Sequence, residues 1–200
     1  MIITKLSLAD YLALNAGPYE GFEGGCEFVN GEIIEMPPES TQNALISLFL
    51  LQQFLQVVPF HWLRRMETEI VVAGRVRLPD FLVLGEELAV ALEGSSRSTI
   101  TEAMPAPLLV VEVVSPGKVN EDRDYRYKRS EYAARGIETY WIVDPAKQMV
   151  TVLTLVDGLY EAQEFVDNDV LSWQESPGEG SEQSRIFSVS VSNLLCPRGH

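Results

Sequence analysis

The chain has 200 residues, 46% of them hydrophobic, and its 15 basic against 29 acidic residues give a formal net charge of −14. This is enough apolar material for one domain with a sizeable core, and no apolar run approaches the roughly 20 residues of a membrane span, so we expect a soluble, cytoplasmic protein with a single domain over residues 1–200. Two cysteines and two histidines disfavour a disulfide framework, a zinc site and a histidine-based nucleophilic triad.

The acidic charge argues against a protein that binds nucleic acid over its whole surface, because phosphate backbones repel such a surface. Basic residues nevertheless outnumber acidic ones in two segments, 64–77 and 118–135. We expect these two segments to form one positive lip around a functional site. Ion pairs at i,i+4 spacing on a helix surface explain part of the second cluster equally well.

Sequence patterns in the first part of the chain predict a helix at 8–14, a β-hairpin at 26–36, a helix at 41–57, and strands at 70–72 and 76–84. Ser7 and Ser40 stand at the N-cap positions of the two helices, and Asn30-Gly31 is the commonest signal for a tight hairpin turn. Asp80 falls inside the second strand. The helix at 41–57 should be largely buried. Ala44, Leu45, Leu48, Leu51 and Leu55 form one apolar stripe, and Ile46, Phe49 and Leu50 widen it.

Patterns in the second part predict a strand at 108–114, a helix at 121–135, a strand at 138–145, a hairpin over 149–155 and 159–166, and a last strand at 186–191. The run 108–114 is apolar except at Glu112, which is typical of a central strand that is buried on both faces. Gly136 ends the helix that follows it.

Asp80 and Glu112 are each embedded in a run that otherwise reads as a core strand. Acidic side chains are rarely buried unless they are paired or bind a metal, so both require a partner. Mg²⁺ or Mn²⁺ takes oxygen ligands and keeps several waters, so two carboxylates on neighbouring strands suffice to hold it beside a phosphate. Lys128 is a candidate residue to orient or deprotonate the attacking water, and its positive charge can also stabilise the transition state. The competing interpretation is that each carboxylate lies on a solvent face or at a strand end.

Further motifs accompany these residues in a characteristic order: Glu27, Pro79-Asp80, Glu112-Val113-Val114-Ser115-Pro116, Asp124, Lys128, Tyr132 and Gly136 to Pro145. In this order the chain resembles the Uma2 family of restriction endonucleases, within the PD-(D/E)XK nuclease superfamily, from the first helix to about Val166. The resemblance implies that Asp80 and Glu112 are metal ligands and that Lys128 is the catalytic lysine, carried on the following helix. It also implies that Glu27 is a further acidic residue of the catalytic site.

One position departs from the superfamily pattern. An unshifted motif has its lysine two residues after the glutamate, where this chain has Val114. The lysine must therefore come from elsewhere, with Lys128 as the first candidate and Lys118 as the second. Lys128 is equally well placed for an ordinary i,i+4 ion pair with Asp124. For Glu27 the alternative is a solvated carboxylate in front of a hairpin.

We therefore predict an α/β protein with a restriction-endonuclease-like fold, in which a central mixed β-sheet is flanked by helices and carries additional β-hairpins. The predicted function is a metal-dependent endonuclease that uses Mg²⁺ or Mn²⁺, hydrolyses DNA and works as a homodimer. One alternative is a binding or regulatory protein that keeps the nuclease fold without cleavage, which the net charge and Val114 favour. Another is an enzyme for a small phosphorylated substrate.

Overall fold

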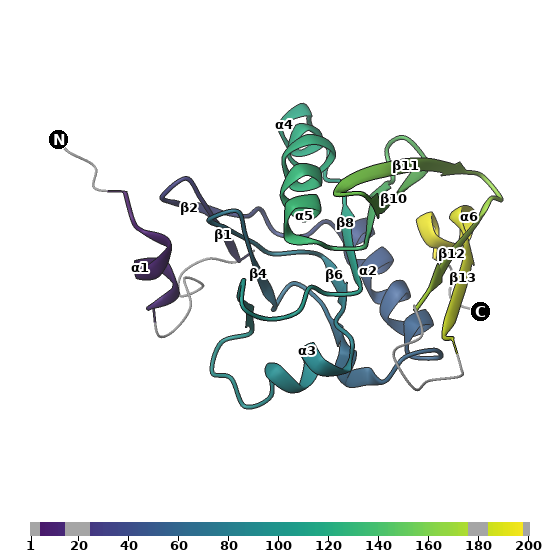
Figure 1. Cartoon of the computed structure of the whole chain (residues 1–200). Helices are drawn as coiled ribbons and strands as arrows, with labels where there is room; N and C mark the ends of the chain where they lie inside the picture. Colours follow the sequence, from purple (N-terminus) through teal and green to yellow (C-terminus); the bar gives the residue numbers. More distant parts are fainter. Residues whose placement is uncertain (1–4, 15–24, 176–183, 198–200) are drawn as a thin grey trace.

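The mixed α/β fold contains two larger β-sheets and a C-terminal β-hairpin (Figure 1). The computed structural model describes residues 5–14, 25–175 and 184–197. The five-stranded sheet has the order β2 (Glu32–Glu35), β1 (Cys26–Val29), β5 (Arg75–Arg77), β4 (Glu69–Val72) and β7 (Thr99–Ile100). The six-stranded sheet has the order β11 (Leu159–Val166), β10 (Met149–Val156), β9 (Thr139–Asp144), β8 (Leu109–Val113), β6 (Phe81–Val83) and β3 (Leu63–Arg64). The hairpin pairs β12 (Val170–Gln174) with β13 (Ile186–Ser190).

The helical segments are α1 (Leu8–Leu12), α2 (Thr41–Phe54), η1 (Phe60–Trp62), α3 (Glu86–Ala91), α4 (Lys118–Asp122), the π-helical η2 (Arg123–Lys128), α5 (Arg129–Arg135) and α6 (Val191–Leu195). The segments α4, η2 and α5 follow one another without a break. In the part of the chain that the structure describes, none of the helices is long and apolar enough to cross a membrane.

Helices cover both faces of the six-stranded sheet. On one face, Phe54 of α2 packs against Phe81 of β6 and Trp141 of β9, with ring centroids 5.4 and 6.4 Å apart. On the other face, Tyr132 of α5 meets the ring of Tyr140 edge-on at 5.0 Å. Because successive residues of a strand point to opposite faces, the neighbours Tyr140 and Trp141 place α5 and α2 on opposite sides of β9. The six-stranded sheet is thus packed on both faces, with ring contacts on each of them.

Several local predictions are confirmed. Ser7 caps α1 and forms the full capping box with Asp10. The hairpin at Asn30-Gly31 pairs β1 with β2, and the hairpin at Asp157-Gly158 pairs β10 with β11. Every residue of β8 is buried, as its apolar run predicts. Gly136 ends α5 in the left-handed conformation, which glycine adopts without strain.

The predicted single strand over 76–84 is wrong, and Asp80 does not lie within a strand. The chain leaves the five-stranded sheet after β5 and enters the six-stranded sheet at β6, with Leu78, Pro79 and Asp80 between them. Pro79 has no N–H to donate to a strand ladder, so pairing is interrupted at this point. Asp80 is therefore the last residue before β6, at the junction of the two sheets.

The predicted apolar face of α2 is wrong in its main stripe, although Ile46 and Leu50, which were expected to widen it, are buried. The buried side chains include Ile46, Leu50 and Phe54, whereas Leu45, Leu48 and Leu55 are 48%, 46% and 48% exposed. Two polar contacts on the buried face determine this rotation of the helix. Asn43 Nδ2 donates to the backbone carbonyl of Val113 at 3.2 Å, and Ser47 Oγ donates to that of Asp80 at 3.3 Å. Hydrophobic periodicity cannot choose a face in a helix that is apolar on nearly all sides.

The helix predicted over 121–135 begins earlier, at Lys118, and contains the π-helical segment η2. Lys118 is therefore a helical residue, exposed on the surface. The elements η1, α3, β7, β12 and α6 have no counterpart in the prediction. They are short segments, for which a sequence pattern has few repeats to show.

Candidate functional site

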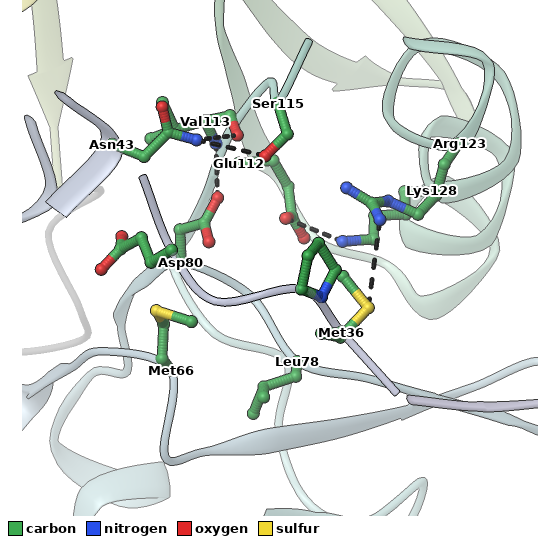
Figure 2. A pocket seen from close by; sticks show the side chains of 12 residues that line it. Met36, Asn43, Met66, Leu78, Asp80, Glu112, Val113, Ser115, Arg123 and Lys128 are labelled. Atoms are coloured by element: carbon green, nitrogen blue, oxygen red, sulfur yellow. Dashed lines mark hydrogen bonds and ion pairs between the residues drawn. The ribbon is translucent and has the colours of Figure 1, made fainter. Parts of the chain in front are cut away.

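Asp80 and Glu112 open into one small cavity near the end of β8 (Figure 2). Its volume of about 30 Å³ is sufficient for a water molecule or a metal ion. Widely separated parts of the chain line it: Met36, Pro37, Glu39, Asn43, Met66, Leu78, Asp80, Glu112, Val113, Ser115, Arg123 and Lys128.

The pairing of β6 with β8 explains why the two carboxylates meet. These strands are antiparallel, with Phe81 opposite Val111. Continuing this register by one residue puts Asp80 opposite Glu112, and residues directly opposite each other point to the same face of a sheet. Asp80 Oδ2 accepts a hydrogen bond from the backbone N–H of Val113 at 2.6 Å. The strand after Asp80 and the strand that carries Glu112 therefore hold the two side chains toward one cavity.

Lys128 lies buried among three carboxylates. Its Nζ is 2.8 Å from Glu112 Oε2, 3.1 Å from Glu27 Oε1 and 3.7 Å from Asp124 Oδ1, and its side chain is 1% exposed. The i,i+4 pair with Asp124 is present, but inside the protein rather than on a helix surface. The structure thus brings Lys128, Glu112 and Glu27 into direct contact, beside the cavity that Asp80 lines.

The π-helical segment η2 aligns the side chains that face this cluster. In an α-helix, residues four apart drift by about 40° around the axis, because 3.6 residues make a turn. A π turn is wider, with i→i+5 hydrogen bonds, and so offsets this drift. Asp124, Lys128 and Tyr132 consequently remain on one buried face. From there Tyr132 Oη donates a hydrogen bond to Glu112 Oε1 at 2.6 Å.

Glu27 takes part in a second group of ion pairs behind Lys128. Arg77 Nη1 donates to Glu27 Oε2 at 2.6 Å, while its Nε and Nη2 hold the carboxylate of Glu131 at 2.7 and 2.9 Å. Burial acts to raise the pKa of Glu27, but the charges of Lys128 and Arg77 outweigh it and lower this pKa to about 2. Glu27 is therefore an ionised, buried counter-ion, and the interpretation of a solvated carboxylate is wrong for this residue.

Carboxylates outnumber cations around the cavity. The acidic members of the network are Glu27, Glu39, Asp80, Glu112, Asp124 and Glu131, and the basic members are Arg65, Arg75, Arg77, Arg123 and Lys128. Burial raises the pKa of Asp80 to about 6. Burial also raises the pKa of Glu112, although the charge of Lys128 opposes this. A bound cation would compensate the surplus negative charge and lower both pKa values.

The donor atoms fit a hard divalent cation that keeps several of its waters. The carboxylates of Glu39, Asp80 and Glu112 belong to the cavity lining, and the buried Glu39 Oε1 has no hydrogen-bond partner among the described residues. Both oxygens of Glu112 already bind, one to Lys128 and one to Tyr132. Over the described ranges, no group of three His, Cys, Asp or Glu side chains that could hold a metal ion is found. Binding through one or two carboxylates and water is the usual mode of Mg²⁺.

Sequence reasoning missed two polar residues of this cavity, Asn43 and Glu39. Asn43 hydrogen-bonds the backbone carbonyl of Val113 and, at 3.3 Å, Ser115 Oγ. Glu39 reaches the cavity from just before the N-cap of α2, whereas Arg123, which reaches it from η2, belongs to the basic segment 118–135 that was expected there. The one signal in the sequence was a polar Asn43 on the face of a helix that buries its apolar residues, which reads equally well as part of the Ser40 cap.

The predicted positive lip is formed only in small part. Arg123 and Lys128 line the cavity, but other basic residues of the segments 64–77 and 118–135 are used inside the protein. Arg77 is buried between two glutamates, Arg129 donates to the backbone carbonyl of Tyr160 at 3.0 Å, and Arg135 donates to that of Met104 at 2.6 Å. These three guanidinium groups bind other residues of the protein, and none of them lines the cavity.

Comparisons with known proteins identify the family of the chain and a similar fold. The Uma2 family model, described as "Putative restriction endonuclease", matches residues 8–184. Among solved structures, the chain is similar to a "putative nuclease belonging to DUF820" from Anabaena variabilis, with a TM-score of 0.64 and 18% sequence identity, over 95% of this chain and 97% of that one. At this identity the likeness concerns the fold. A comparison with curated proteins gives no match.

Proposed function

The chain belongs to the Uma2 family, whose model is described as "Putative restriction endonuclease", and from this premise we propose that it is a metal-dependent endonuclease that hydrolyses DNA phosphodiester bonds. The observation that supports this most is the convergence of Asp80 and Glu112 on one cavity beside the buried Lys128. The proposal includes a restriction-endonuclease-like fold, with the six-stranded sheet as its central sheet and α2 and α5 on its two faces.

In this proposal, Asp80 and Glu112 hold Mg²⁺ or Mn²⁺ at the end of β8. The bound cation would polarise a phosphoryl oxygen and lower the pKa of a water. Tyr132 orients Glu112 through its 2.6 Å hydrogen bond. The backbone N–H of Val113 orients Asp80 in the same manner. Each carboxylate thus has one neighbour that fixes its direction, as metal ligands commonly do.

Lys128 serves as a cation rather than as a base in this mechanism. Burial lowers its pKa, but Glu112, Glu27 and Asp124 outweigh burial, so that the pKa lies above the ordinary lysine value and the ammonium keeps its proton. A permanent positive charge next to Glu112 can stabilise negative charge that develops on a phosphate in the transition state. The three neighbouring carboxylates therefore disfavour proton abstraction from water as the role of this lysine.

Incubation with supercoiled plasmid tests the function directly. The purified protein is expected to convert the plasmid to nicked and linear forms with Mg²⁺ or Mn²⁺, and to do so no longer after EDTA is added. Linear plasmid that forms without a build-up of the nicked form would favour the homodimer, since two centres then cut both strands together. An intact plasmid under all metal conditions would reject the endonuclease proposal.

Metal binding should depend on pH in a defined direction. Below about pH 6 a proton on Asp80 competes with the cation, because burial raises the pKa of this carboxyl to about 6. The affinity for Mn²⁺, measured by isothermal titration calorimetry, is therefore expected to increase as the pH rises through this value. The stability of the metal-free protein should change in the opposite direction. Asp80 keeps its proton to a higher pH in the folded protein than in the unfolded chain, so the free energy of unfolding falls as the pH rises from about 4 to 6. An affinity independent of pH would contradict the assignment of Asp80.

A protein that keeps this fold without cleavage is the second candidate. The observation in its favour is that Lys128 and Tyr132 occupy both oxygens of Glu112, which leaves Asp80 as the more accessible carboxylate. Calorimetry separates the two candidates. A protein that binds Mn²⁺ and cleaves supports the endonuclease, and one that binds DNA without binding Mn²⁺ supports the inactive alternative.

A further inference from the structure

Arg123 reaches the cavity from η2 with only part of its guanidinium engaged (Figure 2). Its Nε and Nη2 face the carboxylate of Asp124 at 3.0 and 3.5 Å. Its Nη1 instead meets the thioether sulfur of Met36 at 3.9 Å, and a thioether is a weak acceptor. No oxygen of a described residue accepts a hydrogen bond from Nη1. One edge of the guanidinium is bound, and the other faces the cavity with donors to spare.

Lys128, the other cation of the cavity, differs in this respect. Its ammonium group has three donors and lies within 3.7 Å of three carboxylates. A new acceptor would have to displace one of these buried carboxylates, which is costly in a dry environment. The two cations therefore have different uses: Lys128 balances the carboxylates, whereas Arg123 can accept a ligand without losing an ion pair.

The position of Arg123 is fixed before any ligand arrives. Asp124 is fully buried and holds the guanidinium by two contacts, so the entropy of ordering this long side chain is lost already in the free protein. A guanidinium presents its N–H groups in a planar fork that matches the oxygens of a phosphate, and it stays charged at every relevant pH. These are the properties of a prepared oxyanion-binding group.

We propose that Arg123 is the phosphate-binding residue of this cavity, with its Nη1 donating to a non-bridging oxygen of a phosphodiester in place of the Met36 sulfur. The choice of a phosphodiester rests on the proposed function, but binding through Arg123 can be measured without cleavage. The carboxylates of Asp80 and Glu112 line the same cavity and repel a phosphate. Binding should therefore require a divalent cation together with Arg123.

Fluorescence anisotropy of a short labelled single-stranded deoxyoligonucleotide, with and without Ca²⁺, tests this proposal. Relative to wild type, Arg123→Gln is expected to raise the Kd in Ca²⁺ about tenfold or more, the scale of one charge-assisted hydrogen bond. Arg123→Lys keeps the charge near Asp124 but loses the fork, so its Kd should also rise. The matched control is Arg126→Gln, which removes an equal charge from a side chain that is 68% exposed and pairs with Asp122. Its Kd should remain near that of wild type.

Arg123 could otherwise serve only to neutralise Asp124, and melting temperatures distinguish the two roles. A purely structural role lowers the melting temperature of both Arg123 variants and leaves the Kd of the folded protein unchanged, which would overturn the proposal. If Arg123→Gln fails to fold, Arg123→Lys decides. A wild-type protein that does not bind the oligonucleotide in Ca²⁺ also overturns it. Binding through Arg123 without plasmid cleavage would retain this inference and reject the endonuclease.

Discussion

Replacing Lys128 by methionine is expected to lower the free energy of unfolding by about 3–5 kcal/mol at neutral pH, the range for removing one partner from a buried ion pair. The methionine fills a similar volume, but Glu27, Glu112 and Asp124 lose the cation that they share. Urea denaturation followed by tryptophan fluorescence measures the change. The same protein should cleave plasmid at least about 10²-fold more slowly where it is still folded, because a positioned positive charge is lost.

The pH dependence of this variant identifies the cause. Without Lys128 the carboxylates have raised pKa values in the folded state, so folding takes up protons and the stability deficit shrinks as the pH falls. Lys118→Met is the matched control, since Lys118 is exposed at the start of α4, and it should change stability by no more than about 0.5 kcal/mol. A Lys128→Met protein as stable as this control would contradict the buried ion-pair network.

Asp80→Asn is expected to lower metal-dependent cleavage at least about 10²-fold, because even the residues that orient a metal ligand contribute 10- to 100-fold. Its thermal stability without metal should instead match or exceed that of wild type at pH 7. Burial raises the pKa of Asp80 to about 6, so the ionised side chain is unfavourable in the folded protein at this pH, and an amide removes that cost. Differential scanning calorimetry and the plasmid assay test the two effects.

Loss of function together with retained or increased stability is the signature of a residue that serves a site rather than the fold. Asp122→Asn provides the control, since Asp122 carries the same charge in a partly exposed pair with Arg126 at 3.5 Å. It should leave both cleavage and Mn²⁺ affinity nearly unchanged. An Asp80→Asn protein that cleaves as well as this control would remove Asp80 from the mechanism.

Sequence signals predicted several helix ends and tight turns correctly, because these features depend on contacts between residues that are close in the sequence. The capping box at Ser7, the turn at Asn30-Gly31 and the stop at Gly136 depend on contacts a few residues apart, and the structure has all three. The apolar run around Glu112 predicted a buried strand correctly. The rotation of α2 was not predictable in this way, because Asn43 and Ser47 bind backbone atoms 70 and 33 residues further along the chain.

The candidate site shows the same division. The sequence by itself determined which residue types were out of place, an acid embedded in each of two apolar runs, and it placed a lysine on the helix that follows. Only the tertiary structure decided that Lys128 pairs with Glu27 as well as with Glu112, that a π turn keeps Asp124 on the same face, and that Arg77 and Arg135 bind other residues of the protein. The reason is physical: the charge state and partners of a buried group depend on every element packed around it, and sequence spacing reports only on the group's own element.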